Sequence, residues 1–209
     1  MLQPSKPFYQ VEEYLWREQR ADIKNEYFDG QIYAMAGGSP EHSQIQANII
    51  LELGTLLRGK DCRVLTSDLK IGVEDKTGLK GRSGRKKSKD FITYPDASVI
   101  CGQLEFYRKD RFTVVNPLIL FEVLSPSTRN YDTNFKLEHY QRIPSLKAYI
   151  ILDSERVWVR SCLRIGDENR WILEEPLEDL ADVLRLEALE LEIPLRQLYE
   201  RVEFAEAEE

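Results

Sequence analysis

Residues 118–124 read Leu-Ile-Leu-Phe-Glu-Val-Leu, so that one carboxylate, Glu122, interrupts six apolar residues. A short and nearly continuous apolar run is typical of a strand that is buried on both faces. A second strand is expected over residues 91–101, where Asp96 follows a Tyr-Pro pair and precedes an apolar stretch. Asp96 therefore opens one predicted strand segment, and Glu122 lies near the end of the next strand.

The two carboxylates become chemically interesting only if they meet. A hairpin-like link through residues 102–117 allows the two strands to be antiparallel neighbours, and Asp96 and Glu122 would then share one rim of the sheet. Two converging carboxylates can hold a divalent cation such as Mg²⁺ or Mn²⁺, which prefers oxygen ligands. A lone carboxylate at a strand end would be an ordinary structural residue, so the prediction of a metal site depends on this convergence.

A helix predicted over residues 128–143 adds a positive charge. Asp132, Lys136 and Tyr140 are spaced by four residues and therefore share one helix face. The helix begins just after the strand of Glu122 and can lie over its end, where Lys136 would neutralise charge on a phosphate. Two carboxylates, a metal ion and a lysine are a minimal set for phosphodiester cleavage. The alternative is that Lys136 is a surface lysine paired with Asp132.

The remaining pattern mixes helices and strands, which predicts an α/β (α+β) fold with a central mixed sheet flanked by helices. The Asp-Gly pair at 29–30 predicts a hairpin turn, and Ser39 followed by Pro40 predicts the start of a long helix that ends at Gly59. We expect a single domain over residues 1–209. The other expected segments are short helices over 11–19 and 195–202 and strands over 62–73, 148–153, 156–162, 170–173 and 184–191.

The composition is that of an ordinary globular protein: 42% of the 209 residues are hydrophobic, and the net charge is −7. No segment approaches the ~18 consecutive apolar residues of a membrane span, and the N-terminus lacks the apolar core of a signal peptide. We therefore expect a cytoplasmic protein. The three cysteines fit neither a disulfide framework nor a zinc site, so we expect Cys62, Cys101 and Cys162 to be reduced.

A basic stretch contrasts with the acidic whole. Residues 76–89 contain seven lysines and arginines and no acid, together with glycine and serine residues that are typical of a flexible loop. One interpretation is a mobile arm that approaches nucleic-acid phosphates, and the other is a solvated hairpin connection. The candidate nucleic-acid contacts in this stretch are Lys80, Arg82, Arg85, Lys86 and Lys87. The tail over 203–209 is acidic.

Six segments in order resemble the Uma-two family, which is numerous in cyanobacteria. They are residues 25–30 (NEYFDG), 39–43 (SPEHS), 94–96 (YPD), 121–128 (FEVLSPST), 131–136 (YDTNFK) and 143–149 (IPSLKAY). The resemblance covers about residues 11–202, and its specificity comes from the order of the segments, since a bare Pro-Asp pair has none. Because the family is placed in the PD-(D/E)XK nuclease superfamily, the resemblance implies a restriction-endonuclease-like fold and a metal-dependent DNA endonuclease.

The resemblance also implies roles for particular residues. Asp96 matches the aspartate of the Pro-Asp element, and Glu122 matches the acid of the (D/E)XK element; both would bind Mg²⁺ or Mn²⁺, with help from the backbone carbonyl of Val123. The superfamily lysine belongs at position 124, where this chain has Leu124. Lys136 on the following helix is the substitute that the family resemblance implies.

Three further residues are supporting candidates. The superfamily commonly uses an acid from the first core helix, which points to Glu41, although a first-turn acid also favours the helix dipole. His42 is a candidate proton carrier or water positioner, with a hydrogen-bonded structural role as the alternative. Glu26 beside the hairpin has a weaker claim, since an ion pair with Lys24 or an arginine would explain it equally well.

Alternatives to an active endonuclease stay open. Because Leu124 replaces the lysine, the chain can be a nuclease-fold protein that binds nucleic acid without cutting it, or a module for protein interactions. Nucleases of this fold are often homodimers, which the resemblance extends to this chain. The apolar run at residues 184–198 could pair two subunits or cover its own sheet.

Overall fold

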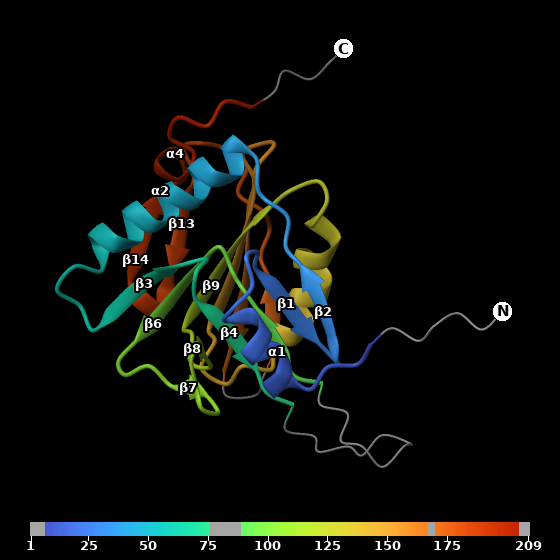
Figure 1. Cartoon of the computed structure of the whole chain (residues 1–209). Helices are drawn as coiled ribbons and strands as arrows, with labels where there is room; N and C mark the ends of the chain where they lie inside the picture. The colour runs from blue at the N-terminus through green and yellow to red at the C-terminus, as the bar shows by residue number, and fades with distance from the viewer. Residues whose placement is uncertain (1–6, 76–88, 167–169, 205–209) are drawn as a thin grey trace.

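The structure is a computed structural model that describes residues 7–75, 89–166 and 170–204. Its strands form two six-stranded mixed sheets and a two-stranded hairpin (Figure 1). The first sheet has the order β2-β1-β5-β4-β8-β7, and its strands are Gln31–Ala34, Asn25–Phe28, Phe91–Thr93, Lys70–Val73, Asp110–Val114 and Phe106–Tyr107. The second has the order β12-β11-β10-β9-β6-β3, with strands Arg170–Leu173, Val159–Ile165, Ala148–Asp153, Ile119–Leu124, Ala97–Cys101 and Cys62–Thr66.

The α+β class with mixed sheets is as predicted, but two of the expected strands are divided between two sheets. The stretch over 91–101 forms β5 in the first sheet and β6 in the second, and residues 62–73 divide likewise into β3 and β4. Pro95 lies at the first division, where a residue without an N–H group cannot continue a ladder of hydrogen bonds. Asp96 therefore lies where the chain passes from one sheet to the other.

The long helix α2, Pro40–Leu56, covers one face of the second sheet. It begins as expected, with the Ser39 side chain accepting a hydrogen bond from the His42 N–H at 3.2 Å and Pro40 in the first turn. Ile45, Ile49 and Leu53 are buried in a core that includes Phe121 of β9. In Figure 1 α2 runs beside α4, Leu195–Leu198, and the hairpin of β13, Val183–Leu186, and β14, Leu191–Pro194.

Strand β9 is buried along its whole length, as its apolar sequence predicts. Phe121 and Val123 belong to the core beneath α2, whereas Leu120 and Leu124 belong to a second core that includes Tyr140 of α3, Leu137–Tyr140. Since side chains alternate along a strand, Glu122 points toward the side of α3. The sequence of β9 thus aims its single carboxylate at the helix that carries Lys136.

The helix over the end of β9 is not a regular α-helix. Residues Tyr131–Lys136 form a π-helical segment that continues into α3 at Leu137. The expected helix therefore exists, but it is shorter than residues 128–143 and wider in its middle. Short π-helical segments occur often at functional sites.

The small elements at the two ends of the chain also differ in detail from the prediction. The helix α1, Val11–Glu18, and the β1–β2 hairpin form as expected, with Asp29 and Gly30 at positive φ in the turn. The single strand expected over 184–191 is instead a hairpin of Val183–Leu186 and Leu191–Pro194 around a 3₁₀ turn at Glu187–Leu189. Its apolar side chains join the core under α2, so this run covers its own sheet.

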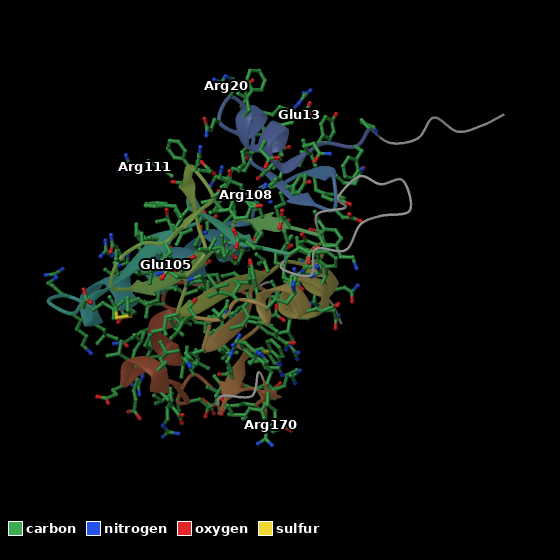
Figure 2. The ribbon with its side chains drawn as sticks, turned by 90° about the horizontal axis from the view of Figure 1, so that it is seen from below. Glu13, Arg20, Glu105, Arg108, Arg111 and Arg170 are labelled. Carbon is green, nitrogen blue, oxygen red and sulfur yellow. A yellow bond between two sulfur atoms is a disulfide. The ribbon has the colours of Figure 1, made fainter. Side chains whose placement is uncertain are left out.

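Strands β7 and β8 form an arm that packs near α1 (Figure 2). Arg108 in the turn between them binds Asp90 at 2.8 Å and also pairs with Glu12 of α1. Asp110 forms an ion pair with Lys70 at 3.2 Å, and both side chains are almost fully buried. The Arg108–Glu12 pair joins this arm to the N-terminal helix, and the Lys70–Asp110 pair links β4 to β8 within the first sheet.

The prediction of three reduced cysteines is wrong for two of them. Cys62 of β3 and Cys101 of β6 lie directly opposite each other in the antiparallel ladder and form a disulfide, the yellow bond in Figure 2. The two residues are 39 positions apart, so their spacing gave no sign of the pairing. Cys162 is a free, buried thiol, as expected. No helix in the described ranges has the length and apolar character needed to cross a membrane.

Candidate active site

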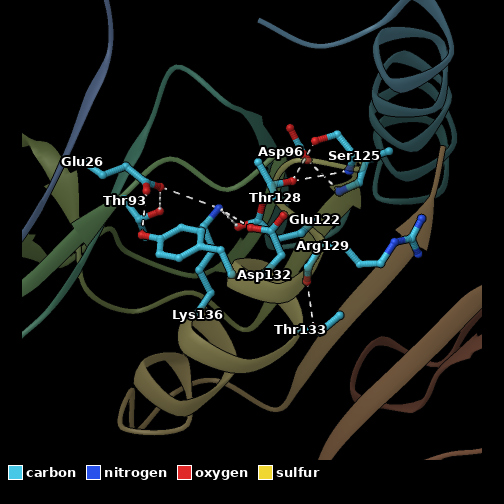
Figure 3. Close-up of polar contacts among 12 residues, drawn as sticks. Glu26, Thr93, Asp96, Glu122, Ser125, Thr128, Arg129, Asp132, Thr133 and Lys136 are labelled. Carbon is cyan, nitrogen blue, oxygen red and sulfur yellow. Dashed lines mark hydrogen bonds and ion pairs between the residues drawn. The ribbon is translucent and has the colours of Figure 1, made fainter. Parts of the chain in front are cut away.

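Asp96 and Glu122 meet at one rim of the second sheet, as the strand pattern predicts. Strands β6 and β9 are antiparallel neighbours in which Ala97 faces Phe121, so the register places Asp96 beside Glu122. The Asp96 Oδ2 atom accepts a hydrogen bond of 2.6 Å from the Val123 N–H. Figure 3 shows the two carboxylates close together where the sheet ends. The two carboxylates thus converge at this rim, which is the arrangement on which the metal-site prediction depends.

Lys136 reaches this rim from the π-helical segment. Its Nζ atom lies 2.9 Å from Glu122 Oε1, 3.1 Å from Asp132 Oδ1 and 3.6 Å from Glu26 Oε1 (Figure 3). All four side chains are at most 7% exposed. One lysine thus faces three carboxylates that come from two sheets and one helix. It is a buried residue and not the surface lysine of the alternative interpretation.

Hydroxyl groups hold these carboxylates in place. Tyr140 donates to Glu122 Oε1 at 2.9 Å, and Tyr131 donates to Glu26 Oε2 at 2.7 Å. The hydroxyl of Thr93 donates to the other oxygen of Glu26. Glu122 and Glu26 are therefore each held by hydroxyl donors.

Burial and mutual repulsion set the charges of the cluster. Burial raises the pKa of the Glu122 carboxyl well above its usual range, and the Lys136 ammonium opposes this rise. Burial also raises the pKa of Asp132. For Lys136, burial disfavours the charged form, but Glu122 and Glu26 outweigh it and raise the lysine pKa well above its usual value. The lysine therefore stays charged, and the surrounding acids exceed it in number.

Helix α2 supports Asp96 from the other side. The Gln46 amide donates to Asp96 Oδ1 at 3.1 Å and to the Asp96 carbonyl oxygen at 3.2 Å. His42 Nε2 lies 3.3 Å from Asp96 Oδ2, and this carboxylate raises the pKa of His42 although burial acts against it. A Cβ atom at Gly38 would lie 2.7 Å from His42 Nδ1, so the glycine leaves room for the imidazole.

The cluster opens into a cavity of about 860 Å³. Asp96, Glu122, Asp132 and Lys136 line one side. Residues of β2 and of the loop that follows it, including Tyr33, also line the cavity. A substrate of substantial size can therefore reach the buried carboxylates.

The other predicted site residues differ in whether they line this cavity. His42 and Glu26 line the cavity, whereas Glu41 does not, and a hydrogen bond from Ser39 lowers the pKa of Glu41 at the helix start. The basic residues Lys80, Arg82, Arg85, Lys86 and Lys87 lie outside the described residues.

Sequence reasoning missed two residues of the site. Asp132 was considered only as a partner for Lys136, although its spacing of four already placed it on the same helix face. Gln46 follows His42 by four residues, so the same rule would have placed both on one face of α2. An uncharged amide gave no further reason to choose it.

The donor set fits a hard divalent cation. Within the described ranges no group of three or more histidines, cysteines or acids is arranged to hold a metal ion. Asp96 and Glu122 supply two carboxylates, which suits Mg²⁺, an ion that usually binds through one or two carboxylates and keeps water and phosphate oxygens as its other ligands.

A family model described as "Putative restriction endonuclease", Uma2, matches residues 11–196. The chain belongs to the Uma2 family. Two proteins of Synechocystis sp. are similar to it: slr1290 is 34% identical over 203 residues, which cover 96% of this chain and 97% of that protein, and sll1609 is 29% identical over 171 residues, which cover 82% and 89%.

A solved structure shows the same fold. It is a crystal structure from Anabaena variabilis described as "a putative nuclease belonging to DUF820", with 15% identity, a TM-score of 0.65 and coverage of 90% of this chain and 96% of that one. The Uma2 membership and the restriction-endonuclease-like fold implied by the resemblance are thus confirmed, and the comparisons point to a nuclease.

Proposed function

We propose that this Uma2 protein is a metal-dependent endonuclease that hydrolyses DNA phosphodiester bonds. The observation that carries the proposal is the convergence of Asp96, Glu122 and Lys136 beside one cavity, with Lys136 Nζ 2.9 Å from Glu122 Oε1. This is the arrangement of oxygen ligands and a cation that cleavage of a phosphodiester requires. The family and the fold agree with it.

Asp96 and Glu122 are the proposed ligands of Mg²⁺ or Mn²⁺, with the backbone carbonyl of Val123 as a further ligand. Gln46 and the Val123 N–H fix the orientation of Asp96, and Tyr140 fixes that of Glu122. A bound cation would supply charge stabilisation at the phosphate and would lower the pKa of a bound water. His42, which contacts Asp96, is in reach to hold or accept a proton at its Nε2 atom.

In this proposal Lys136 replaces the superfamily lysine that is absent at position 124. Leu124 lies two residues after Glu122 on the same side of β9, but it is packed in the core with Leu137 and Tyr140. A lysine there would point into apolar side chains. From the helix, the ammonium of Lys136 reaches Glu122 instead, where it can donate to a phosphate and stabilise the negative charge that develops during cleavage.

The test is cleavage of supercoiled plasmid with and without Mg²⁺ or Mn²⁺. Wild type should cut only with metal, and Asp96→Ala and Lys136→Ala should both lose this activity. Glu138→Gln and Lys147→Ala are matched controls, since both residues are exposed and do not line the cavity. Cleavage that persists equally in all variants would come from a contaminant, and no cleavage of any substrate would favour a binding or interaction module.

The assembly proposed for the endonuclease is a homodimer, which is common among nucleases of this fold. The apolar run at 184–198 does not supply the contact, because its side chains pack inside the subunit. Light scattering of the purified protein checks the assembly: a mass near twice 24.4 kDa supports it, and a mass of 24.4 kDa contradicts it.

A further inference from the structure

One part of the cavity lining is chemically unlike the carboxylates. It is built by β2 and the loop after it, and the residues over 34–38 are Ala-Met-Ala-Gly-Gly, which carry no charge and no hydrogen-bonding side chain. A phosphodiester would find its partners on the acidic side, with its cation and lysine. An uncharged part of the lining suits a different part of the substrate.

Tyr33 is the aromatic side chain in this part of the lining. In the antiparallel ladder of β1 and β2 it lies directly opposite Glu26, and side chains of directly opposed residues project on the same face of the sheet. Glu26 Oε1 is 3.6 Å from Lys136 Nζ, so the register places Tyr33 one side chain away from the proposed phosphate-binding lysine.

Tyr33 is also available to a ligand. The residue is 48% exposed, whereas the hydroxyl of Tyr131 already donates a hydrogen bond to Glu26. Within the described ranges the Tyr33 hydroxyl has no hydrogen-bond partner. An exposed aromatic ring beside a catalytic cluster is suited to stacking on a nucleic-acid base, a contact that every base can make.

The depth of the cluster bears on the form of the nucleic acid. The side chains of Lys136 and Glu122 are only 5% and 4% exposed, so a phosphate must enter the cavity to reach them. The backbone of a paired duplex is held on a stiff cylinder, whereas an unpaired nucleotide can turn its phosphate and base inward. A cavity of about 860 Å³ has room for such a nucleotide.

From these observations, and resting on the proposed function, we propose that the cavity binds an unpaired nucleotide of a DNA strand, with its phosphate at Lys136 and its base stacked on Tyr33. The preferred substrate is then single-stranded DNA or an unpaired segment within a duplex. Tyr33 contacts the base and not the scissile bond, so it determines which form of DNA binds.

The experiment measures fluorescence anisotropy of a fluorescein-labelled twelve-nucleotide oligo-dT strand and of the matching duplex, with Ca²⁺ in place of Mg²⁺. Wild type should bind the single strand at least tenfold more tightly than the duplex. Tyr33→Ala should weaken binding of the single strand by about 5- to 100-fold and change duplex binding little. Tyr33→Phe should bind as wild type does, because stacking uses the ring.

Phe112→Ala is the matched control, since Phe112 is an exposed aromatic residue on β8 that does not line the cavity. It should leave binding unchanged. The inference is overturned if Tyr33→Ala binds the single strand as tightly as wild type, or if wild type prefers the duplex. Plasmid cleavage by the same preparations separates the two proposals. If the wild type cuts plasmid and Tyr33→Ala binds the single strand as tightly as the wild type, only the stacking of a base on Tyr33 is overturned. If the wild type neither cuts plasmid nor binds DNA, both proposals are overturned.

Discussion

Two buried ionic clusters in this molecule look alike in composition and differ in arrangement. In the first sheet Lys70 faces Asp110 at 3.2 Å, with Thr113 donating to the same carboxylate. At the rim of the second sheet Lys136 faces Glu122, Asp132 and Glu26. The first cluster is balanced and does not line the large cavity, whereas the second has an excess of acid and opens into it.

The carboxyl pKa values follow this difference. For Asp110, burial alone would raise the pKa, but Thr113 and Lys70 outweigh it and lower the pKa below its usual value. For Glu122, burial prevails over Lys136, and the pKa rises. A buried ion pair by itself therefore indicates structure, and an unbalanced cluster beside a cavity indicates function.

The largest expected effect separates the clusters by stability. Lys70→Ala leaves Asp110 as an uncompensated buried charge and should lower the free energy of unfolding by about 3–5 kcal/mol. Urea denaturation measures it. A loss below about 1 kcal/mol would mean that the balanced pair contributes little to holding β4 and β8 together in the first sheet.

The second largest expected effect is on metal-dependent cleavage. Lys136→Met should lower metal-dependent cleavage by about 100- to 1,000-fold, the usual loss when a group that stabilises the transition state is removed. Its stability loss should be smaller than that of Lys70→Ala, because the cavity gives water and cations access to the carboxylates. Parallel urea denaturation and plasmid cleavage check this. Equal destabilisation with unchanged cleavage would make the second cluster structural too.

Much of the second cluster could be predicted from the sequence. The apolar run around Glu122 indicated a buried strand, and the spacing of Asp132 and Lys136 indicated a shared helix face; both signals are local. The division of residues 91–101 between two sheets was not predictable in this way, because an apolar run shows burial but not which strands it pairs with. The pairing of Cys62 with Cys101 depends on the same long-range register.

The support from α2 could be predicted only in part, and it gives a smaller effect. Gln46→Leu removes the two hydrogen bonds to Asp96 and should weaken Mn²⁺ binding by about 10- to 100-fold, as is typical when a partner of a metal ligand is lost. Calorimetric titration with Mn²⁺ measures this. Gln44→Leu, on another side of α2, is the control. Unchanged affinity in Gln46→Leu would show that Asp96 needs no such support.

Gly38→Ala should act through His42. The added methyl group would lie 2.7 Å from the imidazole and displace it from Asp96, and we expect a loss of cleavage of about tenfold. Gly37→Ala is the matched control, because nothing lies within 4 Å of its added Cβ atom. Equal cleavage rates for the two variants would show that the position of His42 does not affect cleavage.

The smallest effect is in the dependence of stability on pH. The lowered pKa of Asp110 stabilises the fold above about pH 3.8, and this contribution is lost as the pH falls through the folded pKa. The raised pKa of Glu122 makes the folded state bind the extra proton, so its contribution is present below about pH 4.5 and is lost as the pH rises through the folded pKa. Urea denaturation across pH 3–7 should show opposite changes in slope for Asp110→Asn and Glu122→Gln. If both substitutions change the slope of stability against pH in the same direction, the pKa shifts given for Asp110 and Glu122 are contradicted.

The central claim is that the unbalanced cluster holds a divalent cation through Asp96 and Glu122. Calorimetric titration of the wild type with Mn²⁺ tests it most directly, beside Asp96→Asn, Glu122→Gln and the exposed control Glu138→Gln. We predict Mn²⁺ binding that is retained in Glu138→Gln and lost in both site variants. Binding of equal strength in all four proteins, or no binding in the wild type, would contradict the account.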